Sequence, residues 1–237
     1  EVEDGGEFTA TLPDVISWNA EIPYLYNLRI VYERECIPEV IGFRRIEVAD
    51  GGVVLINGQK IKFKGVNRHD SDPKTGYTIN REQLLTDLML MKQHNVNALR
   101  TSHYPNAPWA YHFYDRVGLY VIDEADIETH GVLDLWGGGR RSGAYDGLSV
   151  EVDDYGYIAN DPMWGPAIQD RIEHCAKRDV NRPSVIMWSM GNESGYGVNF
   201  EASAAWLKEF DPSRLVHYEG SCYQSPGHKN DLTNIDI

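Results

Sequence analysis

The sequence has few cysteines, and their arrangement excludes two kinds of stabilised small domain. Only Cys36, Cys175 and Cys222 are present, and no two of them form a C-x-x-C pair. An odd number at such wide spacings disfavours both a disulfide framework and a cysteine-rich zinc site. We therefore expect reduced thiols and a cytoplasmic protein. The chain begins with Glu1 rather than Met, which indicates a piece of a longer protein or a processed product, in which a removed export signal would leave no trace.

Basic residues and long apolar runs are also scarce. The chain has 22 Lys and Arg against 36 Asp and Glu, a formal net charge of −14, and the basic residues do not cluster. This balance argues against nucleic acid as a partner. No stretch approaches the roughly 18 apolar residues that a membrane-spanning helix needs, so we expect no membrane partner. The hydrophobic share of 42% is that of an ordinary globular chain, and a small molecule remains as the expected ligand.

The first 50 or so residues indicate the end of an all-β domain. Residues 22–32 and 40–48 alternate apolar and polar side chains, which predicts two half-buried strands. This stretch is too short to bury a core of its own. Two apolar runs within residues 53–61 flank Asn57 and Gly58, a pair that predicts a hairpin lying over the start of a new domain.

From residue 62 onward, apolar strands alternate with amphipathic helices. We expect strands at 62–67, 96–100, 119–123, 184–190 and 215–218, the start of a sixth at 233–237, and helices at 80–94, 108–117, 163–180 and 200–210. This alternation predicts a parallel sheet covered by helices, either open and doubly wound or closed into a barrel. No G-x-G-x-x-G follows the first strand, which disfavours a dinucleotide-binding open sheet.

Polar residues follow the end of every expected strand, and in a barrel those ends form the face that carries the active site. We therefore predict an α/β fold: an incomplete TIM (β/α)8 barrel in residues 50–237, with about five of its strands present. Residues 1–49 are expected to be the end of a preceding domain.

Glu193 is the first candidate for chemistry, because it follows the apolar strand SVIMWSM directly. A carboxyl group at such a position is expected to be desolvated, so that it holds a proton near neutral pH and can act as an acid or base. A lone Glu is more often a helix cap or an ion-pair partner. The strand-end position and the neighbouring Asn192 favour the functional interpretation. Ser194 lacks the G-x-S-x-G setting of a serine hydrolase.

Glu128 and His130 are two residues apart, so in an extended segment their side chains point the same way. A carboxylate with one imidazole suits Mg²⁺ or Mn²⁺ better than zinc, although an ordinary ion pair is the common alternative. His69 and His103 each follow a strand and could bind substrate hydroxyls, although single histidines are more often structural. Trp136, in the glycine-rich stretch 131–161, is a candidate surface for stacking on a ligand.

Several segments together resemble the β-galactosidases of glycoside hydrolase family 2. These are GVNRHD (65–70), NALRTSHYPN (97–106), LYVIDEADIETHG (119–131), RPSVIMWSMGNESGYG (182–197) and DPSRLVHYEG (211–220), in the family's order and spacing. The segment IGFRRIEV (41–48) resembles the family's junction between its second β-sandwich and its barrel. The resemblance spans nearly the whole chain and favours galactosidases over the family's glucuronidases and mannosidases.

The resemblance implies an immunoglobulin-like sandwich before a TIM barrel, and cleavage of terminal β-galactosides such as lactose with retention of configuration. It implies that Glu193 is the acid/base and that Asn192 contacts the sugar 2-hydroxyl. Mg²⁺ would be held by Glu128, His130 and Glu193, and Na⁺ would be a second ion of the full-length protein. His69 and His103 would support the transition state. The complete enzyme is expected to be a homo-oligomer.

The nucleophile that the resemblance implies is a Glu after the seventh strand of the barrel, which is not in this sequence, and Glu219 does not match it. We therefore expect this chain alone to be inactive, because removing one member of a catalytic unit costs orders of magnitude. The leading hypothesis is a piece of a retaining β-galactosidase. The alternatives are a non-catalytic carbohydrate-binding or metal-binding module and a structural fragment that complements a missing half.

Overall fold

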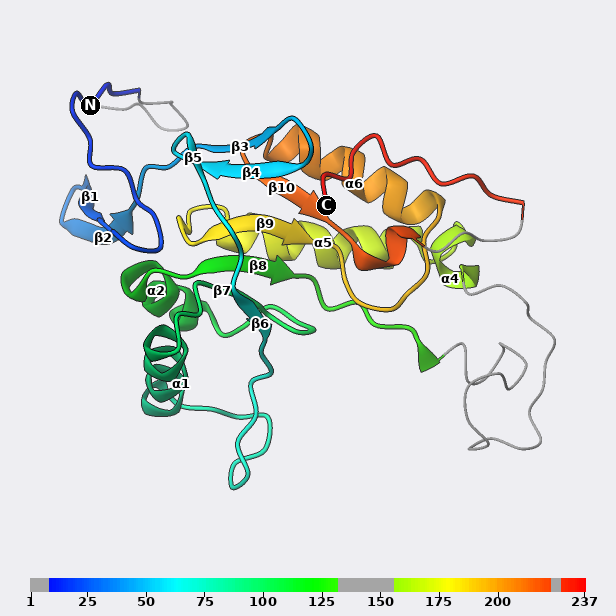
Figure 1. The fold of residues 1–237 in the computed structure, drawn as a ribbon, viewed down its shortest axis with the longest axis horizontal. Coiled ribbons are helices and arrows are strands. Elements are labelled where there is room, and N and C mark those ends of the chain that lie inside the picture. The colour runs from blue at the N-terminus through cyan, green and yellow to red at the C-terminus, as the bar shows by residue number, and fades with distance from the viewer. Residues whose placement is uncertain (1–8, 132–155, 223–226) are drawn as a thin grey trace.

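The computed structural model describes residues 9–131, 156–222 and 227–237. Its centre is a five-stranded parallel sheet, drawn in Figure 1, whose members are β6 (Gly65–Asn67), β7 (Ala98–Arg100), β8 (Tyr120–Glu124), β9 (Val185–Ser189) and β10 (Leu215–His217). The strands follow one another in chain order across the sheet. A doubly wound sheet reverses its order at a switch point, whereas a βα barrel does not, so this order favours the barrel.

Residues 233–237, where a sixth strand was expected, contain no regular strand. Their backbone nevertheless bonds to β10, because the amide of Asp236 donates to the carbonyl of Val216 at 2.9 Å. The end of the chain therefore lies beside the last strand of the sheet.

Helices connect the strands and cover the outer face of the sheet. They are α1 (Arg81–Gln93), α2 (Pro108–Val117), α4 (Tyr157–Asn160), α5 (Gly165–Asp179), α6 (Val198–Phe210) and the short 3-10 helix η1 (Glu219–Cys222). A capping box is present at the start of α1, where Asn80 and Gln83 exchange side chain-to-backbone hydrogen bonds. Gly118 ends α2 in the left-handed region, at φ 80°. The four longer helices lie within two residues of their expected positions, whereas α4 was not predicted.

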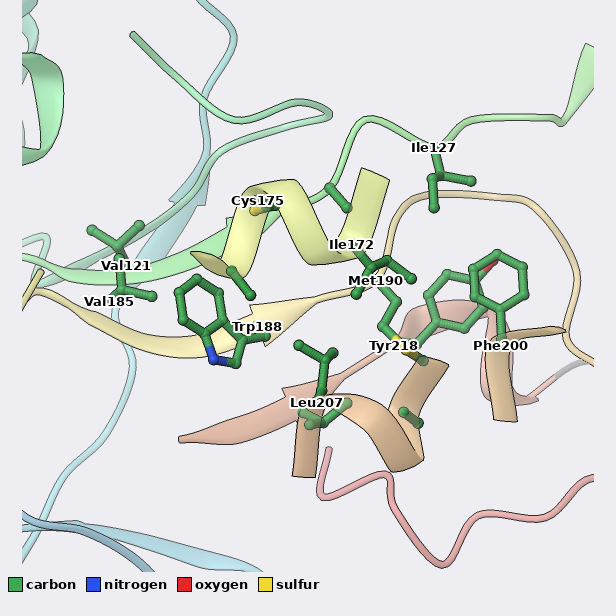
Figure 2. Close-up of a cluster of buried hydrophobic side chains, with 14 of the residues drawn as sticks. Val121, Ile127, Ile172, Cys175, Val185, Trp188, Met190, Phe200, Leu207 and Tyr218 are labelled. Carbon is green, nitrogen blue, oxygen red and sulfur yellow. The ribbon is translucent and has the colours of Figure 1, made fainter. Parts of the chain in front are cut away.

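The main hydrophobic core lies between the sheet and these helices (Figure 2). Val121 of β8 and Trp188 of β9 face Ile172 of α5 and Leu207 of α6, and all four side chains are buried. A second cluster covers the opposite face of the sheet, where Trp18 and Val54 pack near Tyr120 and Ile186. The central strands β8 and β9 are therefore buried on both faces, which explains why they are apolar runs rather than alternating ones.

The first 60 residues form two small antiparallel sheets. One pairs β1 (Tyr26–Tyr32) with β2 (Glu35–Ile41), and the other contains β3 (Ile46–Ala49), β4 (Val53–Ile56) and β5 (Gln59–Lys60). The expected hairpin around Asn57 and Gly58 is confirmed, with φ 53° and 76° at these residues. The prediction of one strand over residues 40–48 is wrong, because the chain leaves β2 after Ile41 and enters the other sheet at Ile46.

The preceding immunoglobulin-like sandwich and the division at residue 50 stay predictions. The turn at residues 50–52 joins β3 and β4, which are hydrogen-bonded neighbours. All three cysteines are free, as expected. Among the described residues, no helix has the length and apolar character needed to cross a bilayer.

Candidate active site

The last residues of four neighbouring strands meet at one edge of the sheet. Arg100 ends β7, Glu124 ends β8, Ser189 ends β9 and His217 ends β10. Parallel pairing sets Glu124 opposite Ser189, and Ser189 opposite His217. Since the carboxyl ends of parallel strands open onto the same edge, polar groups from distant parts of the sequence come into contact here.

Glu124 is the centre of this group. Its side chain has no exposed surface. One carboxylate oxygen lies 2.6 Å from Nδ1 of His103, and the other accepts from Ser189 Oγ at 2.6 Å. The second oxygen also accepts from Nε of Arg100. Its three side-chain neighbours are thus all donors, which satisfies a group that only accepts hydrogen bonds.

Glu128, His130 and Glu193 form a second cluster of side chains at this edge. Their ligand atoms all lie within 4.8 Å of one another. Nδ1 of His130 is 3.0 Å from Glu128 Oε1 and 3.5 Å from Glu193 Oε2. All three side chains are accessible, and each offers at least one donor atom to a cation. The sequence placed Glu128 and His130 on one side of an extended segment, and the structure brings Glu193 to them from another strand.

Asn192 links the cluster of Glu128, His130 and Glu193 to the buried group around Glu124. Its amide nitrogen donates to Glu128 Oε1 at 2.9 Å, and its amide oxygen accepts from Nη2 of Arg100 at 2.9 Å. Its backbone N–H donates to the carbonyl of Ile127 at 2.8 Å. A continuous series of contacts therefore runs from His103 through Glu124, Arg100 and Asn192 to Glu128.

His69 and His103 also meet, although they come from different strand ends. Their rings are perpendicular, with centroids 5.3 Å apart. The backbone N–H of Asp70 donates to the hydroxyl of Tyr104 at 3.1 Å, so the two segments following β6 and β7 are tied together. The histidines, Asn192 and the acidic groups that were predicted as site residues thus share one edge of the sheet.

The backbone at Glu193 is unusual, with φ 41°. Its N–H donates to Oε1 of Glu219 at 2.6 Å, which fixes the turn after β9. The carboxyl group of Glu193 was expected to be desolvated. Its side chain is instead 48% exposed among the described residues. Trp136 lies outside the described residues.

Burial, together with the nearby positive charge of Arg100, lowers the pKa of His217 to about 4. His217 is therefore neutral near pH 7. Nδ1 of His217 lies 3.0 Å from Ser189 Oγ, whose own proton is directed at Glu124. The hydrogen bonds accordingly run in one direction, from His217 through Ser189 to Glu124.

Sequence reasoning missed Arg100, Glu124 and Ser189 as site residues. A signal was present, because each is the polar final residue of an apolar strand. Their contacts depend on the register between strands whose contacting residues lie up to 65 positions apart, and that register cannot be read from the sequence. The site at the strand ends therefore includes a floor of largely buried polar side chains, which are Arg100, Glu124 and Ser189.

The fold and this edge define a βα-barrel domain with an acidic, histidine-containing site. Residues 46–236 match the family model described as glycosyl hydrolases family 2, TIM barrel domain. The chain therefore belongs to glycosyl hydrolase family 2, and its sheet is part of that family's TIM barrel.

Curated relatives carry the name β-galactosidase. The chain is 51% identical over 234 residues to that of Actinobacillus pleuropneumoniae, covering 94% of this chain and 23% of the relative. It is 42% identical over 220 residues to that of Staphylococcus xylosus, covering 93% and 21%. The chain thus spans about a fifth of the length of these relatives.

Solved structures with a similar fold include other members of the family. A Faecalibacterium prausnitzii β-glucuronidase aligns with a TM-score of 0.70 and 29% identity, over 97% of this chain and 36% of that one. The β-galacturonidase of Eisenbergiella tayi aligns with a TM-score of 0.68 and 25% identity, over 88% and 34%. The fold is therefore shared by enzymes named for different sugars.

Proposed function

We propose that this chain forms the acid/base half of a retaining β-galactosidase. The observation that carries the proposal is the meeting of Glu193, Glu128 and His130 at the same strand edge as His103 and Asn192. The identity of 38–51% to relatives named β-galactosidase supports galactosides over the uronides named in the solved structures. Lactose and related β-galactosides are the proposed substrates.

In this mechanism Glu193 protonates the leaving oxygen while a second carboxylate attacks the anomeric carbon. Glu193 then removes a proton from the water that releases the sugar. Two carboxyl groups about 5–5.5 Å apart are needed for this retaining chemistry. The left-handed backbone at Glu193 and the bond from its N–H to Glu219 fix the position of its Cα at the strand end. This places the carboxyl group over the edge.

The remaining residues bind and orient the sugar. Asn192 contacts the 2-hydroxyl, and its amide is held by partners on both sides. His69 and His103 support the transition state, with Nδ1 of His103 engaged by Glu124. Trp136 supplies a stacking surface.

Glu128, His130 and Glu193 fit a magnesium ion, because ligand atoms of two carboxylates and one imidazole lie within 4.8 Å of one another and each side chain is accessible. Oxygen ligands are those that Mg²⁺ prefers, and the ion usually keeps several waters. When bound, the cation would lower the proton affinity of the neighbouring carboxylates. We also propose a Na⁺ ion, but only for the longer protein.

The nucleophile belongs to a segment outside this sequence, so the chain alone is inactive in this proposal. The working enzyme is a longer polypeptide that completes the barrel and assembles into a homo-oligomer, and its location is the cytoplasm. A structural or sugar-binding fragment without catalysis is the competing function.

The test compares hydrolysis of an aryl β-galactoside and the matching aryl β-glucuronide by a longer polypeptide that includes this chain. We expect turnover of the galactoside, and a loss of about 10²- to 10⁴-fold on Glu193→Gln. Glu173→Gln, which changes a half-buried glutamate on α5 that pairs with Lys177, is the matched control and should retain activity. Preference for the glucuronide would overturn the galactosidase proposal, and full activity of Glu193→Gln would overturn the acid/base role.

A further inference from the structure

We propose that Glu124 is a positioning residue that fixes both His103 and Asn192, and that Arg100 carries its effect to Asn192. This inference rests on the proposed glycosidase function. It assigns roles to two residues of which one, Glu124, has no exposed side-chain surface. Both end neighbouring strands of the sheet, β8 and β7, which lie side by side in Figure 1.

The contact with His103 sets which ring nitrogen faces the site. A carboxylate accepts hydrogen bonds, so His103 must donate its Nδ1–H across the 2.6 Å contact. The other ring nitrogen, Nε2, is then the one left for a substrate hydroxyl. The His103 side chain is 17% exposed, whereas Glu124 is completely buried. Glu124 thus acts from beneath the surface, through the histidine.

The contact with Arg100 sets the orientation of the Asn192 amide. Arg100 uses Nε for Glu124 and Nη2 for the Asn192 oxygen, so one rigid guanidinium joins the two groups. Because the amide oxygen is occupied by this donor, the amide nitrogen must point the other way, toward Glu128. A lysine at position 100 would keep the charge but would lack the fork that holds two partners at once.

Ser189 and His217 hold the second oxygen of Glu124 in place. Ser189 Oγ donates to Glu124 at 2.6 Å and lies 3.0 Å from Nδ1 of His217. The backbone N–H of Glu124 donates to Thr101 Oγ1 at 2.9 Å. These hydrogen bonds restrict the movement of the Glu124 side chain. A residue that orients other site residues must itself be held in one position.

The experiment uses purified full-length enzyme that includes this chain, with an aryl β-galactoside as substrate. Glu124→Gln should lower kcat/KM by about 10- to 100-fold, the usual effect of removing a partner that orients a site residue. The same change made in a His103→Ala, Asn192→Ala background should cost less than about threefold more, because the residues through which Glu124 acts are gone. Equal losses in both backgrounds would overturn the inference.

Arg100→Lys is the second variant and remains informative where Glu124→Gln fails to fold. Its loss of kcat/KM should be large on the galactoside and much smaller on the matching 2-deoxygalactoside, which lacks the hydroxyl that Asn192 is proposed to contact. A merely structural role would reduce both substrates equally, and that result would contradict the inference.

Asp211→Asn is the matched control, because Asp211 is a buried carboxylate that also pairs with an arginine, Arg214, but lies away from this edge. It should lower the melting temperature while leaving kcat/KM within about twofold of wild type. A loss of kcat/KM as large as that of Glu124→Gln would overturn the inference, because any buried ion pair would then have the same effect. Wild-type enzyme that cleaves no aryl β-galactoside would refute the proposed function instead.

Discussion

At the residue scale, the site depends on polar groups that the sheet buries together. Glu124 and Ser189 are buried and His217 is partly buried, and each has a hydrogen-bond partner. Burying such groups without partners would cost about 1–3 kcal/mol each. The strand ends therefore hold a network that must be complete in order to be stable.

His217 predicts a pH dependence of stability with a definite sign. Its pKa is about 4 in the folded chain against the ordinary 6.5, so the folded state binds fewer protons between these values. Its contribution to stability is complete above pH 6.5 and is lost as the pH falls toward 4, by roughly 3 kcal/mol. In chemical denaturation across pH 4–7, the stability of the wild type should rise more steeply with pH than that of His217→Asn. Parallel curves would refute the assignment.

Asp115 provides the control of opposite sign. Burial raises its pKa to about 6, so its contribution favours folding at low pH and is lost as the pH rises from about 4 to about 6. Asp115→Asn should therefore make the remaining stability rise more steeply with pH, whereas His217→Asn should make it rise less. Comparing the two variants separates the contributions of His217 and Asp115 to the pH dependence of stability, which overlap in the wild type.

The metal proposal makes a separate prediction for Glu128. Removing Mg²⁺ from the longer enzyme with a chelator should lower activity, and added Mg²⁺ should restore it. Glu128→Gln removes one anionic ligand, so the Mg²⁺ concentration needed for half-maximal activity should rise by about 10-fold or more. An unchanged Mg²⁺ requirement in Glu128→Gln, measured beside wild type, would show that this carboxylate is not a ligand.

At the scale of elements, the turn after β9 positions Asn192 and Glu193. Gly191 has φ 140°, and a Cβ there would lie 2.8 Å from Cβ and from the carbonyl oxygen of Ile127. The parallel bridge between Glu128 and Asn192 is formed at this point. The close backbone approach therefore requires glycine.

Gly191→Ala should destabilise the enzyme by roughly 1–3 kcal/mol and also lower its activity, because it pushes the Glu128 and Asn192 segments apart. Gly51→Ala is the matched control, since Gly51 also has a positive φ, 78°, but has nothing within 4 Å of a new Cβ. It should cost stability alone. Thermal unfolding and kcat/KM for both variants test this, and an active Gly191→Ala would contradict it.

Most helices and central strands could be predicted because their apolar periods and caps are local. The break within residues 40–48 could not, since the period-two pattern continues on both sides of it. The chain changes sheets beside Gly42, where a Cβ would lie 2.8 Å from Cβ of Pro183. This contact joins residues 141 positions apart, and so does the bond from Arg44 Nη2 to the carbonyl of Val185.

The candidate site was predicted as a set of strand-end residues, and the structure places Glu193, Glu128, His130, Asn192 and both histidines at that edge. Their catalytic and ligand roles stay predictions. The buried floor of Arg100, Glu124 and Ser189 was not predicted, because it requires three strands in register.

At the scale of the whole molecule, the sheet is an arc of the barrel rather than a closed ring. Within the described residues, β6 has only β7 as a neighbour, so its other edge is unpaired. Val66 of β6 is 40% exposed. An unpaired strand with an exposed apolar side chain is a template for pairing with another chain.

The isolated 237-residue chain should therefore associate and show no turnover of an aryl β-galactoside. Sedimentation velocity over a range of protein concentrations measures the association, and a matched assay of the longer polypeptide provides the active reference. A stable monomer with cooperative unfolding would contradict the prediction of association. Measurable turnover by the isolated chain would show that the nucleophile lies within it.

In the proposed function, Glu193 transfers the proton to the leaving group. This role is tested most directly by measuring kcat/KM of wild-type and Glu193→Gln full-length enzyme on aryl β-galactosides whose leaving groups differ in acidity. We expect a large loss for phenols that need protonation and almost none for a dinitrophenol that does not. An equal loss across all leaving groups would contradict this role.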